Sequence, residues 1–350
     1  MRSESIEREN PITQENLELL RRTSGTGPVL ILTHDYPDPD ALASGMALSA
    51  LISKAWDIPS KLVYSGVVAR AENRAMLHLL TPSWEFHEQV QDFDAYSAIA
   101  LVDTQPGAGN NSYPTERNAN IVIDHHNPLR DHSHLVPYTD IRPNVGATST
   151  LLFQYFQAAD ITPDQNLATA MFYGLHTDTQ GLARGASTAD EMVYFDLLGL
   201  LDRKMLVQVE QAGLSRLYFQ AFCGGLQAAR VYGKVIISDL GSIHRPDLSG
   251  EMADVLIRLD SARAALCYGT HSHVLYLSLR TKSLDKDAGT IAQALVAGFG
   301  KAGGHGSMAG GQVPLADQDL HSLIKTVDER MLMILDETNP GIPLLDRQQF

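Results

Sequence analysis

The first half of the chain alternates unbroken apolar runs with segments whose apolar residues recur at helical spacing. PVLILTH (residues 28–34), SAIALVDT (97–104) and NANIVIDHH (118–126) each contain such a run, which is typical of a strand buried on both faces. ALASGMALSALISKA (41–55) follows the first run and has the spacing of an amphipathic helix. This alternation predicts an α/β fold whose N-terminal part is a doubly wound, mostly parallel sheet.

The second half of the chain has a different pattern. Apolar residues recur at helical spacing from 147 to about 229, and KVIISDLG (234–241) then predicts a new strand. ALCYGTHSHVLYLSLRT (265–281) predicts a hairpin, and KAGGHGSMAGGQV (301–313) predicts a glycine-rich loop. We therefore expect a smaller C-terminal α/β domain that carries this loop. The predicted divisions are a first domain at 1–215, a helical linker at 216–230 and a second domain at 231–350.

Composition narrows the class of protein. With 44% hydrophobic and 19% charged residues, the chain has the composition of a globular protein, and no apolar run is long enough to span a bilayer. Its net charge of −14 argues against binding to long duplex nucleic acid, because such surfaces are basic. The first ten residues lack an apolar signal segment, and two cysteines cannot form a disulfide framework. We expect a cytoplasmic protein without a membrane partner.

Acidic residues and histidines gather where the predicted strands end. Taken singly, each has an ordinary structural explanation: Asp38 fits a turn beside two prolines, Asp40 fits a helix cap, and His125 fits a core histidine. Taken together, they form a set with the composition of a metal site. The set consists of His34, Asp38, Asp40, Asp103, Asp124, His125, His126 and Asp178.

Ligands in an open α/β sheet bind outside the carboxyl ends of the strands, so this set is expected to converge there. Oxygen and imidazole donors suit Mn²⁺, Mg²⁺, Fe²⁺ or Co²⁺ better than a thiolate-preferring metal. Two such ions about 3.5–4 Å apart form a clamp for displacement at phosphorus. The sequence therefore predicts two divalent cations and phosphoester chemistry.

HDYPDPDALASG, ALVDT, VIDHHNP and GLHTDT resemble, in order and spacing, the four motifs of the DHH phosphoesterases, which are named for the triplet Asp124-His125-His126. LSLRT and GKAGGHGSMAGGQV resemble the DHH-associated C-terminal domain, whose usual GGGH is Ala302-Gly303-Gly304-His305 here. The resemblance covers nearly the whole chain. The arrangement is most similar to the branch of nanoRNase-like oligoribonucleases and pAp phosphatases, which is related to the larger RecJ exonucleases.

The resemblance implies a role for each motif residue. His34 and Asp38 would bind one Mn²⁺, and Asp40, His125 and Asp178 would bind the second, with Asp103 bridging the two. Asp124 would orient a histidine, His126 would meet the scissile phosphate as a donor or general acid, and water between the ions would attack. The residues implied in substrate binding are Arg184, Arg280, Gly303, Gly304, His305, Gly310 and Gly311.

The leading hypothesis is a metal-dependent hydrolase of short oligonucleotides or of a nucleotide bisphosphate such as pAp. Three alternatives stay open: a cyclic dinucleotide phosphodiesterase, a family II pyrophosphatase or exopolyphosphatase, and a non-catalytic nucleotide sensor. The basic SRKKQ-like ending of the pyrophosphatases is not found here, and silent relatives usually lack a metal ligand, whereas all six are present. A homodimer is a possible assembly.

Overall fold

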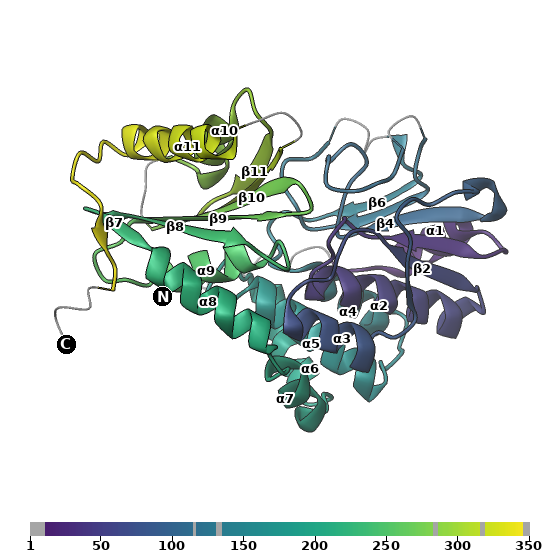
Figure 1. The fold of residues 1–350 in the computed structure, drawn as a ribbon. Helices are drawn as coiled ribbons and strands as arrows, with labels where there is room; N and C mark the ends of the chain where they lie inside the picture. Colours follow the sequence, from purple (N-terminus) through teal and green to yellow (C-terminus); the bar gives the residue numbers. More distant parts are fainter. Residues whose placement is uncertain (1–10, 115–116, 131–134, 283–285, 316–318, 346–350) are drawn as a thin grey trace, which may run out of the picture. The chain divides into compact units, whose positions relative to one another are not determined.

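The computed structural model describes residues 11–114, 117–130, 135–282, 286–315 and 319–345. The contacts between residues divide the chain into two units, and the boundary between them in the sequence falls between Ala212 and Gly213. Each unit has a sheet and a hydrophobic core of its own, so the predicted α/β class is confirmed (Figure 1). Within the described residues, no helix is long and apolar enough to cross a membrane.

The first unit is built on a six-stranded sheet in the order β3-β2-β1-β4-β5-β6. Every neighbouring pair is parallel, as the unbroken apolar runs predict. The order reverses direction between β1 and β4, which makes the edge above these two strands a topological switch point. The strands are β1 (Val29–Leu32), β2 (Ser60–Tyr64), β3 (Trp84–Phe86), β4 (Ala98–Val102), β5 (Ile121–Asp124) and β6 (Tyr138–Ile141).

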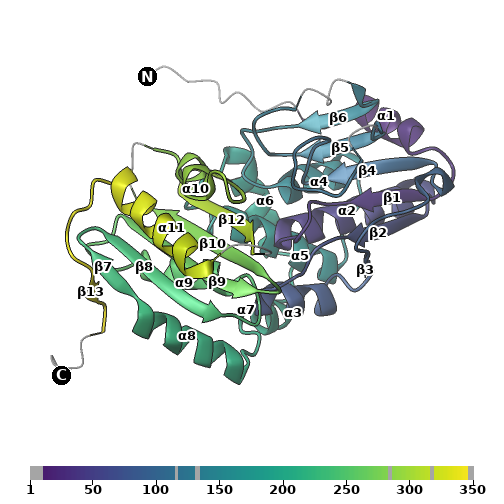
Figure 2. The ribbon, with the colours of Figure 1, turned by 45° about the horizontal axis from the view of Figure 1, so that its top comes forward.

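One face of this sheet packs against helices, with α2 lying against both α4 and α5 (Figure 2). The helices are α1 (Gln14–Ser24), α2 (Pro39–Trp56), α3 (Ala71–Leu79), α4 (Thr148–Ala158), α5 (Gln165–Asp178), α6 (Thr188–Leu198) and α7 (Arg203–Glu210). The other face is covered mainly by connecting segments, through Phe93 of the short 3₁₀ helix η1 (Phe93–Ala95), Tyr113, Ala119 and Val136. The topology is therefore doubly wound, but loops take the place of helices on the second face.

The second unit holds a seven-stranded sheet in the order β11-β12-β10-β9-β8-β7-β13, which is antiparallel except for the β8–β9 pair. The strands are β7 (Arg230–Tyr232), β8 (Val235–Ser242), β9 (Ala264–His271), β10 (Val274–Thr281), β11 (Lys301–His305), β12 (Met308–Pro314) and β13 (Ile342–Pro343). The helices are α8 (Arg216–Ala228), α9 (Leu248–Leu256), α10 (Ala288–Val296) and α11 (Leu320–Ile334). The segment predicted as a linker is α8, which packs on β8 and α9 of this unit.

The glycine-rich segment is a β-hairpin, and the prediction of a loop there is wrong. Gly303 pairs with Gly310, and Gly304 pairs with Ala309, across the β11–β12 ladder. A Cβ on Gly304 would lie 2.3 Å from the carbonyl oxygen of Met308, and a Cβ on Gly289 would lie 2.2 Å from that of Gly304. The glycines therefore allow the close approach of strands and helix, which composition alone does not distinguish from a flexible loop.

Candidate metal centre

The predicted site residues meet at the switch point of the first sheet. His34 lies two residues beyond β1, Asp103 directly follows β4, and Asp124 is the last residue of β5, with His125 next. Since β1, β4 and β5 are parallel neighbours, their carboxyl ends share one edge. The motifs, far apart in sequence, are brought together by this topology.

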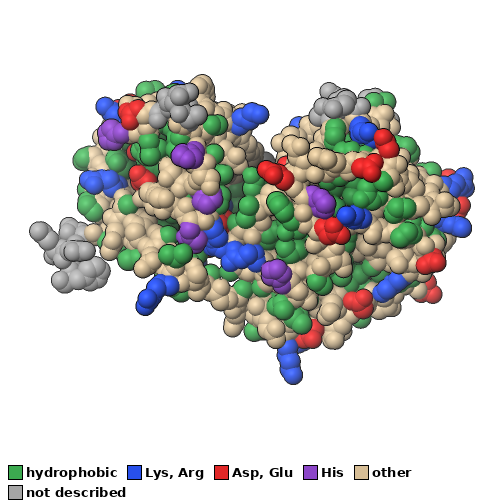
Figure 3. All heavy atoms as spheres, turned by 45° about the vertical axis from the view of Figure 1, so that its right-hand side comes forward, with side chains coloured by type: hydrophobic (Ala, Val, Ile, Leu, Met, Phe, Trp, Pro, Cys, Tyr) green, Lys and Arg blue, Asp and Glu red, His purple; other side chains and the backbone are tan. Residues whose placement is uncertain are grey.

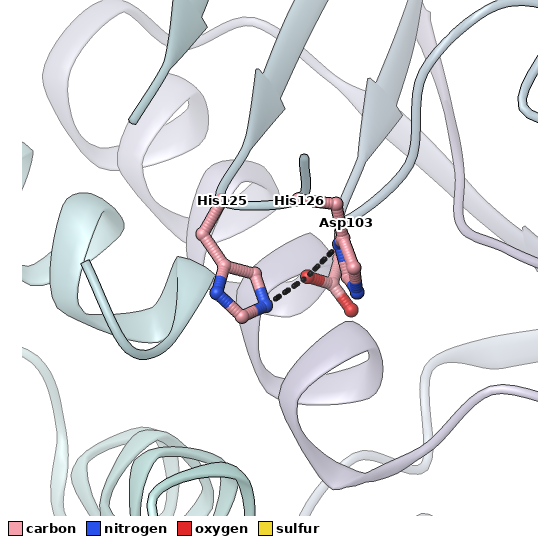
Figure 4. Close-up of side chains that lie close together, drawn as sticks. All are labelled: Asp103, His125 and His126. Carbon is pink, nitrogen blue, oxygen red and sulfur yellow. Dashed lines mark ion pairs between the residues drawn. The ribbon is translucent and has the colours of Figure 1, made fainter. Parts of the chain in front are cut away.

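Asp103 lies at the centre of the site, fully buried among the histidines (Figure 4). Its Oδ2 is 3.5 Å from His34 Nε2, and its Oδ1 is 3.6 Å from His125 Nε2. These distances are too long for hydrogen bonds. Ligand bonds of about 2.0–2.2 Å place two donors of one ion about 3 to 3.5 Å apart. The spacing around Asp103 therefore fits carboxylate and imidazole donors that share a cation.

The hydrogen bonds of the two histidines fix which ring nitrogen faces Asp103. The Nδ1 atoms of His34 and His125 lie 2.9 Å and 3.1 Å from the carbonyl oxygens of Asp35 and Val145. A carbonyl oxygen only accepts, so each Nδ1 carries the proton and the neutral ring presents the lone pair of Nε2. Among the described residues, buried His125 Nε2 and Asp103 Oδ2 have no hydrogen-bond partner. A cation beside each of these atoms would satisfy it.

Three triads of donors lie close enough to hold an ion each, and one of them is Asp103, His125 and His126. The other two share no residue with each other. His34, Asp38 and Asp103 form one, and Asp40, His125 and Asp178 form the other, with the donor atoms of each triad within 4.8 Å of one another. His125 Nε2 is 3.5 Å from Asp178 Oδ2. These are the groupings that the resemblance implies, with Asp103 also near His125. The structure thus assembles all six side chains, and their assignment as ligands stays a prediction.

Asp40 is held by the first turn of α4, a contact that sequence reasoning missed. The backbone N–H groups of Thr148 and Ser149 donate to its two carboxylate oxygens at 2.6 and 2.9 Å, and the Thr148 hydroxyl donates to Asp103 Oδ1 at 2.7 Å. Asp40 is fully buried, and the positive end of a helix dipole suits a buried carboxylate. The only sequence signal is the Thr-Ser pair at the start of a helical pattern.

The alternative reading of Asp38 and Asp40 as structural residues is partly right. Asp38 caps α2, since one of its oxygens accepts from Ala41 N at 3.0 Å, while its other oxygen is 3.7 Å from His34 Nε2. Asp40 is not a cap but lies inside the first turn of α2. Asp38 therefore shares its two oxygens between the helix and the candidate metal site.

Asp124 orients His126 rather than joining a ligand triad. Its Oδ1 accepts from His126 Nδ1 at 2.8 Å, and its Oδ2 accepts from Gln105 Nε2 at 2.7 Å. Gln105, which sequence reasoning also missed, donates in addition to the carbonyl oxygen of His126 at 3.0 Å and accepts from Arg130 N at 2.9 Å. The side chain of His126 is 38% exposed, so it reaches solvent beside the buried cluster.

The electrostatics show that the cluster needs positive charge. Burial lowers the pKa of His34, but Asp103 and Asp38 outweigh this and raise it well above its ordinary value. Burial, with the charges of Asp103 and Asp178, raises the pKa of Asp40 far above its usual range. Burial and the charge of Asp38 raise the pKa of Asp178 to about 6. His34, Asp40 and Asp178 therefore bind protons more tightly than isolated side chains do, and cations would take the place of those protons.

Figure 3 shows a face of the molecule on which histidine side chains reach the surface close to acidic and hydrophobic side chains. Of the residues predicted to bind substrate, Arg184 lies next to the cluster, because its Nη2 donates to the carbonyl oxygen of Asp178 at 3.2 Å. Arg280, on β10, pairs through Nε with Asp254 of α9. The side chain of His305 lies outside the described part of the chain.

Two family models match the chain. Residues 28–175 match the DHH family, N-terminal domain, and residues 232–332 match the DHHA1 domain. The first match contains every candidate metal ligand except Asp178. The second contains Arg280 and the glycine hairpin.

The chain is also similar in sequence to individual proteins. An uncharacterized protein of Methanocaldococcus jannaschii, MJ1633, is 34% identical over 308 residues, which are 86% of this chain and 62% of that protein. The bifunctional oligoribonuclease and PAP phosphatase NrnA of Thermus thermophilus is 28% identical over 49% of this chain and 50% of its own. A probable manganese-dependent inorganic pyrophosphatase of Streptococcus equi subsp. zooepidemicus is 25% identical over 54% and 59%. The chain thus spans less than two thirds of each of these relatives.

A solved structure supports the fold over almost the whole chain. An exopolyphosphatase-related protein of Bacteroides fragilis superposes with a TM-score of 0.73 at 16% identity, covering 93% of this chain and 99% of that one. At this identity the likeness concerns the fold alone.

Proposed function

The chain belongs to the DHH family, with the family's N-terminal domain followed by a DHHA1 domain, and from this premise we propose that it hydrolyses phosphate esters with two divalent cations. The observation that carries the proposal is the arrangement around Asp103. A buried carboxylate faces two histidine Nε2 atoms across 3.5 and 3.6 Å, with one of its oxygens and His125 Nε2 lacking a hydrogen-bond partner among the described residues.

The donor set fits a hard or borderline divalent cation, and Mn²⁺ is our first choice. A relative named as a manganese-dependent enzyme supports that choice. His34 and Asp38 would hold one ion, Asp40, His125 and Asp178 the other, and Asp103 would contact both. When bound, such ions supply the positive charge that polarises a phosphate ester and activates the attacking water.

His126 is suited to donate a proton to the substrate. Burial lowers the pKa of His126, but Asp103 and Asp124 outweigh it and raise the pKa to about 9, before the charge of any bound cation is added. Asp124 accepts from Nδ1, which leaves the N–H at Nε2 for a phosphoryl or leaving-group oxygen. Gln105 would keep Asp124 in place, as a positioning residue that does not touch the substrate.

For the substrate we propose a short oligonucleotide or a nucleotide bisphosphate such as pAp. A relative named as an oligoribonuclease and PAP phosphatase supports this class, and a net charge of −14 is compatible with a short substrate. We propose that the second domain, beyond the predicted linker at 216–230, contributes to substrate selection. Its candidate residues remain Arg280, Gly303, Gly304, His305, Gly310 and Gly311, with Arg184 as the candidate in the first domain.

Hydrolysis of inorganic pyrophosphate is the second candidate. The match to a probable inorganic pyrophosphatase favours it, because that match covers 54% of this chain. The same cation site would serve either reaction, so the metal geometry does not separate the two candidates. The substrate has to be tested directly.

The test measures phosphate and nucleotide release with Mn²⁺ from a 5′-phosphorylated diribonucleotide, pAp, a cyclic dinucleotide and pyrophosphate. Asp103→Ala removes the central carboxylate, and Asp94→Ala is a matched control, since Asp94 is an exposed partner of Arg117. We expect mononucleotide or AMP release that Asp103→Ala abolishes and Asp94→Ala leaves intact. Turnover of pyrophosphate alone would replace the nucleotide proposal by the second candidate. Mn²⁺ binding without turnover of any of the four would refute the catalytic proposal and favour a sensor.

A further inference from the structure

Tyr36 is an aromatic side chain beside the candidate metal centre that the mechanism above does not use. It lies between His34 and Asp38, two residues from each. Consecutive Cα atoms are about 3.8 Å apart, so the Cα of Tyr36 is no more than about 7.6 Å from that of either residue. The backbone that carries this side chain therefore lies within about the length of one nucleotide of two candidate ligands.

The backbone of Tyr36 is in a conformation that a bulky residue rarely adopts. Its φ is +58°, in the left-handed region that favours glycine. The surrounding bonds hold it there: Tyr36 N donates to the carbonyl oxygen of Ser65 at 2.8 Å, and Asp35 N donates to that of Asn110 at 2.7 Å. The hydroxyl of Ser112 donates to Asp35 at 2.9 Å. Strain that the surroundings maintain next to a functional site is a reason to look for a role.

The position of the ring strengthens this reasoning. Gly66 leaves room for it, because a Cβ there would lie 2.9 Å from Cγ and 3.0 Å from Cδ1 of Tyr36. Although it is seated in this way, the residue is 49% exposed, and none of the described aromatic rings packs against it. The fold thus holds the backbone that carries this aromatic side chain and leaves the residue half exposed, as a binding surface requires.

We propose that Tyr36 is a stacking platform for a nucleobase of the substrate, an inference that rests on the proposed nucleotide hydrolysis. With a phosphate at the cation site, an adjacent base can lie on the exposed ring. Stacking of a base on an aromatic side chain tolerates any base, since each has a π face. Tyr36 would therefore favour substrates with a base over pyrophosphate, without selecting one base.

The test compares binding of AMP and of ribose 5-phosphate, which lacks the base, to the Mn²⁺-loaded protein by calorimetry. Tyr36→Leu and Tyr36→Asn both remove the ring, and asparagine tolerates the left-handed conformation, so at least that variant should fold. Tyr36→Phe keeps the ring. We expect both ring-less variants to bind AMP about tenfold or more weakly, with ribose 5-phosphate within twofold, and Tyr36→Phe to match the wild type.

Equal weakening of AMP and ribose 5-phosphate would overturn the proposal, because the residue would then act on the cation site or the backbone. Unchanged AMP binding in the ring-less variants, or no AMP binding by the wild type, would also overturn it. Hydrolysis is measured in a separate assay. If the wild type binds AMP but hydrolyses no nucleotide, the proposed function is wrong while the stacking result stands. With turnover, the loss should appear in KM for the diribonucleotide and not in kcat.

Discussion

Replacing Gln105 with leucine tests whether a buried amide holds the DHH triplet in place. Among the described residues, the Gln105 side chain donates to Asp124 Oδ2 and to the carbonyl oxygen of His126 and accepts from Arg130 N. Gln105 is 2% exposed and Asp124 is fully buried, so water does not readily replace the lost partners. Leucine has a similar size and no polar atom. The variant therefore isolates the contribution of the amide.

The magnitude follows from what each bond connects. Burial alone would raise the pKa of Asp124, but the bonds from His126 and Gln105 outweigh it and lower the pKa, so the carboxylate is charged. A bond to a charged group contributes about 1.5–3 kcal/mol, and each of the other two about 0.5–1.5 kcal/mol. The added apolar surface of leucine offsets part of this loss. We expect Gln105→Leu to lower the free energy of unfolding by about 3 kcal/mol.

Urea unfolding of the metal-free protein, followed by tryptophan fluorescence, measures this loss. Both tryptophans, Trp56 and Trp84, lie in the first unit, so the signal reports on that unit. Gln157→Leu is the matched control, since the exposed Gln157 also donates to an aspartate, Asp196, and surface changes usually stay within about 0.5 kcal/mol. A loss below about 1 kcal/mol for Gln105→Leu, or an equal loss in the control, would refute the reasoning.

Three further predictions follow from other parts of the structure. Mn²⁺ at 100 times its dissociation constant should raise the free energy of unfolding by about 2.7 kcal/mol, and Asp103→Asn should remove most of this gain in a thermal unfolding assay. Burial raises the pKa of Asp328 to about 6, so the stability contributed by its proton is lost as the pH rises through 6. Asp328→Asn should therefore raise the free energy of unfolding by about 1–2 kcal/mol at pH 8 but change it little at pH 4. Urea unfolding at the two pH values measures this difference. Gly174→Ala should lower the free energy of unfolding by about 1–3 kcal/mol, because the added Cβ would lie 2.9 Å from the Cα of Asp40. Gly224→Ala, whose Cβ would have no atom within 4 Å, should instead stabilise α8 by up to about 1 kcal/mol. Unfolding followed by circular dichroism measures both changes.

The parallel sheet and the convergence of the motifs can be predicted from the sequence for one reason. Strands buried on both faces leave unbroken apolar runs, and the chemistry follows directly after each run, as in Leu32 before Thr33-His34 and Val102 before Asp103. Parallel strands place their carboxyl ends at one edge, so the order of runs and acids is enough to gather the site. Neither step needs the packing of individual side chains.

What sequence reasoning missed depends on atoms that leave no pattern. The donors to Asp40 are backbone N–H groups of Thr148 and Ser149, and every residue except proline has one. Gln105 is one glutamine in a polar loop, and only the fold brings it to Asp124 across 19 positions. The glycine hairpin was missed because glycines that permit close approach and glycines that permit flexibility have the same composition.

The carboxylates of the cluster divide their oxygens between hydrogen bonds of the fold and the candidate cation site, and this division explains why so many carboxylates lie close together. Asp38 uses one oxygen to cap α2 and turns the other toward His34, and Asp103 accepts from Thr148 with one oxygen while the other has no hydrogen-bond partner in the described chain. Asp124 has both oxygens occupied, by His126 and by Gln105. A carboxylate with one oxygen free of hydrogen bonds can bind a cation without breaking a bond of the fold. This division supports the proposal that Asp38 and Asp103 are ligands and that Asp124 is a positioning residue, although all three lie within the same cluster.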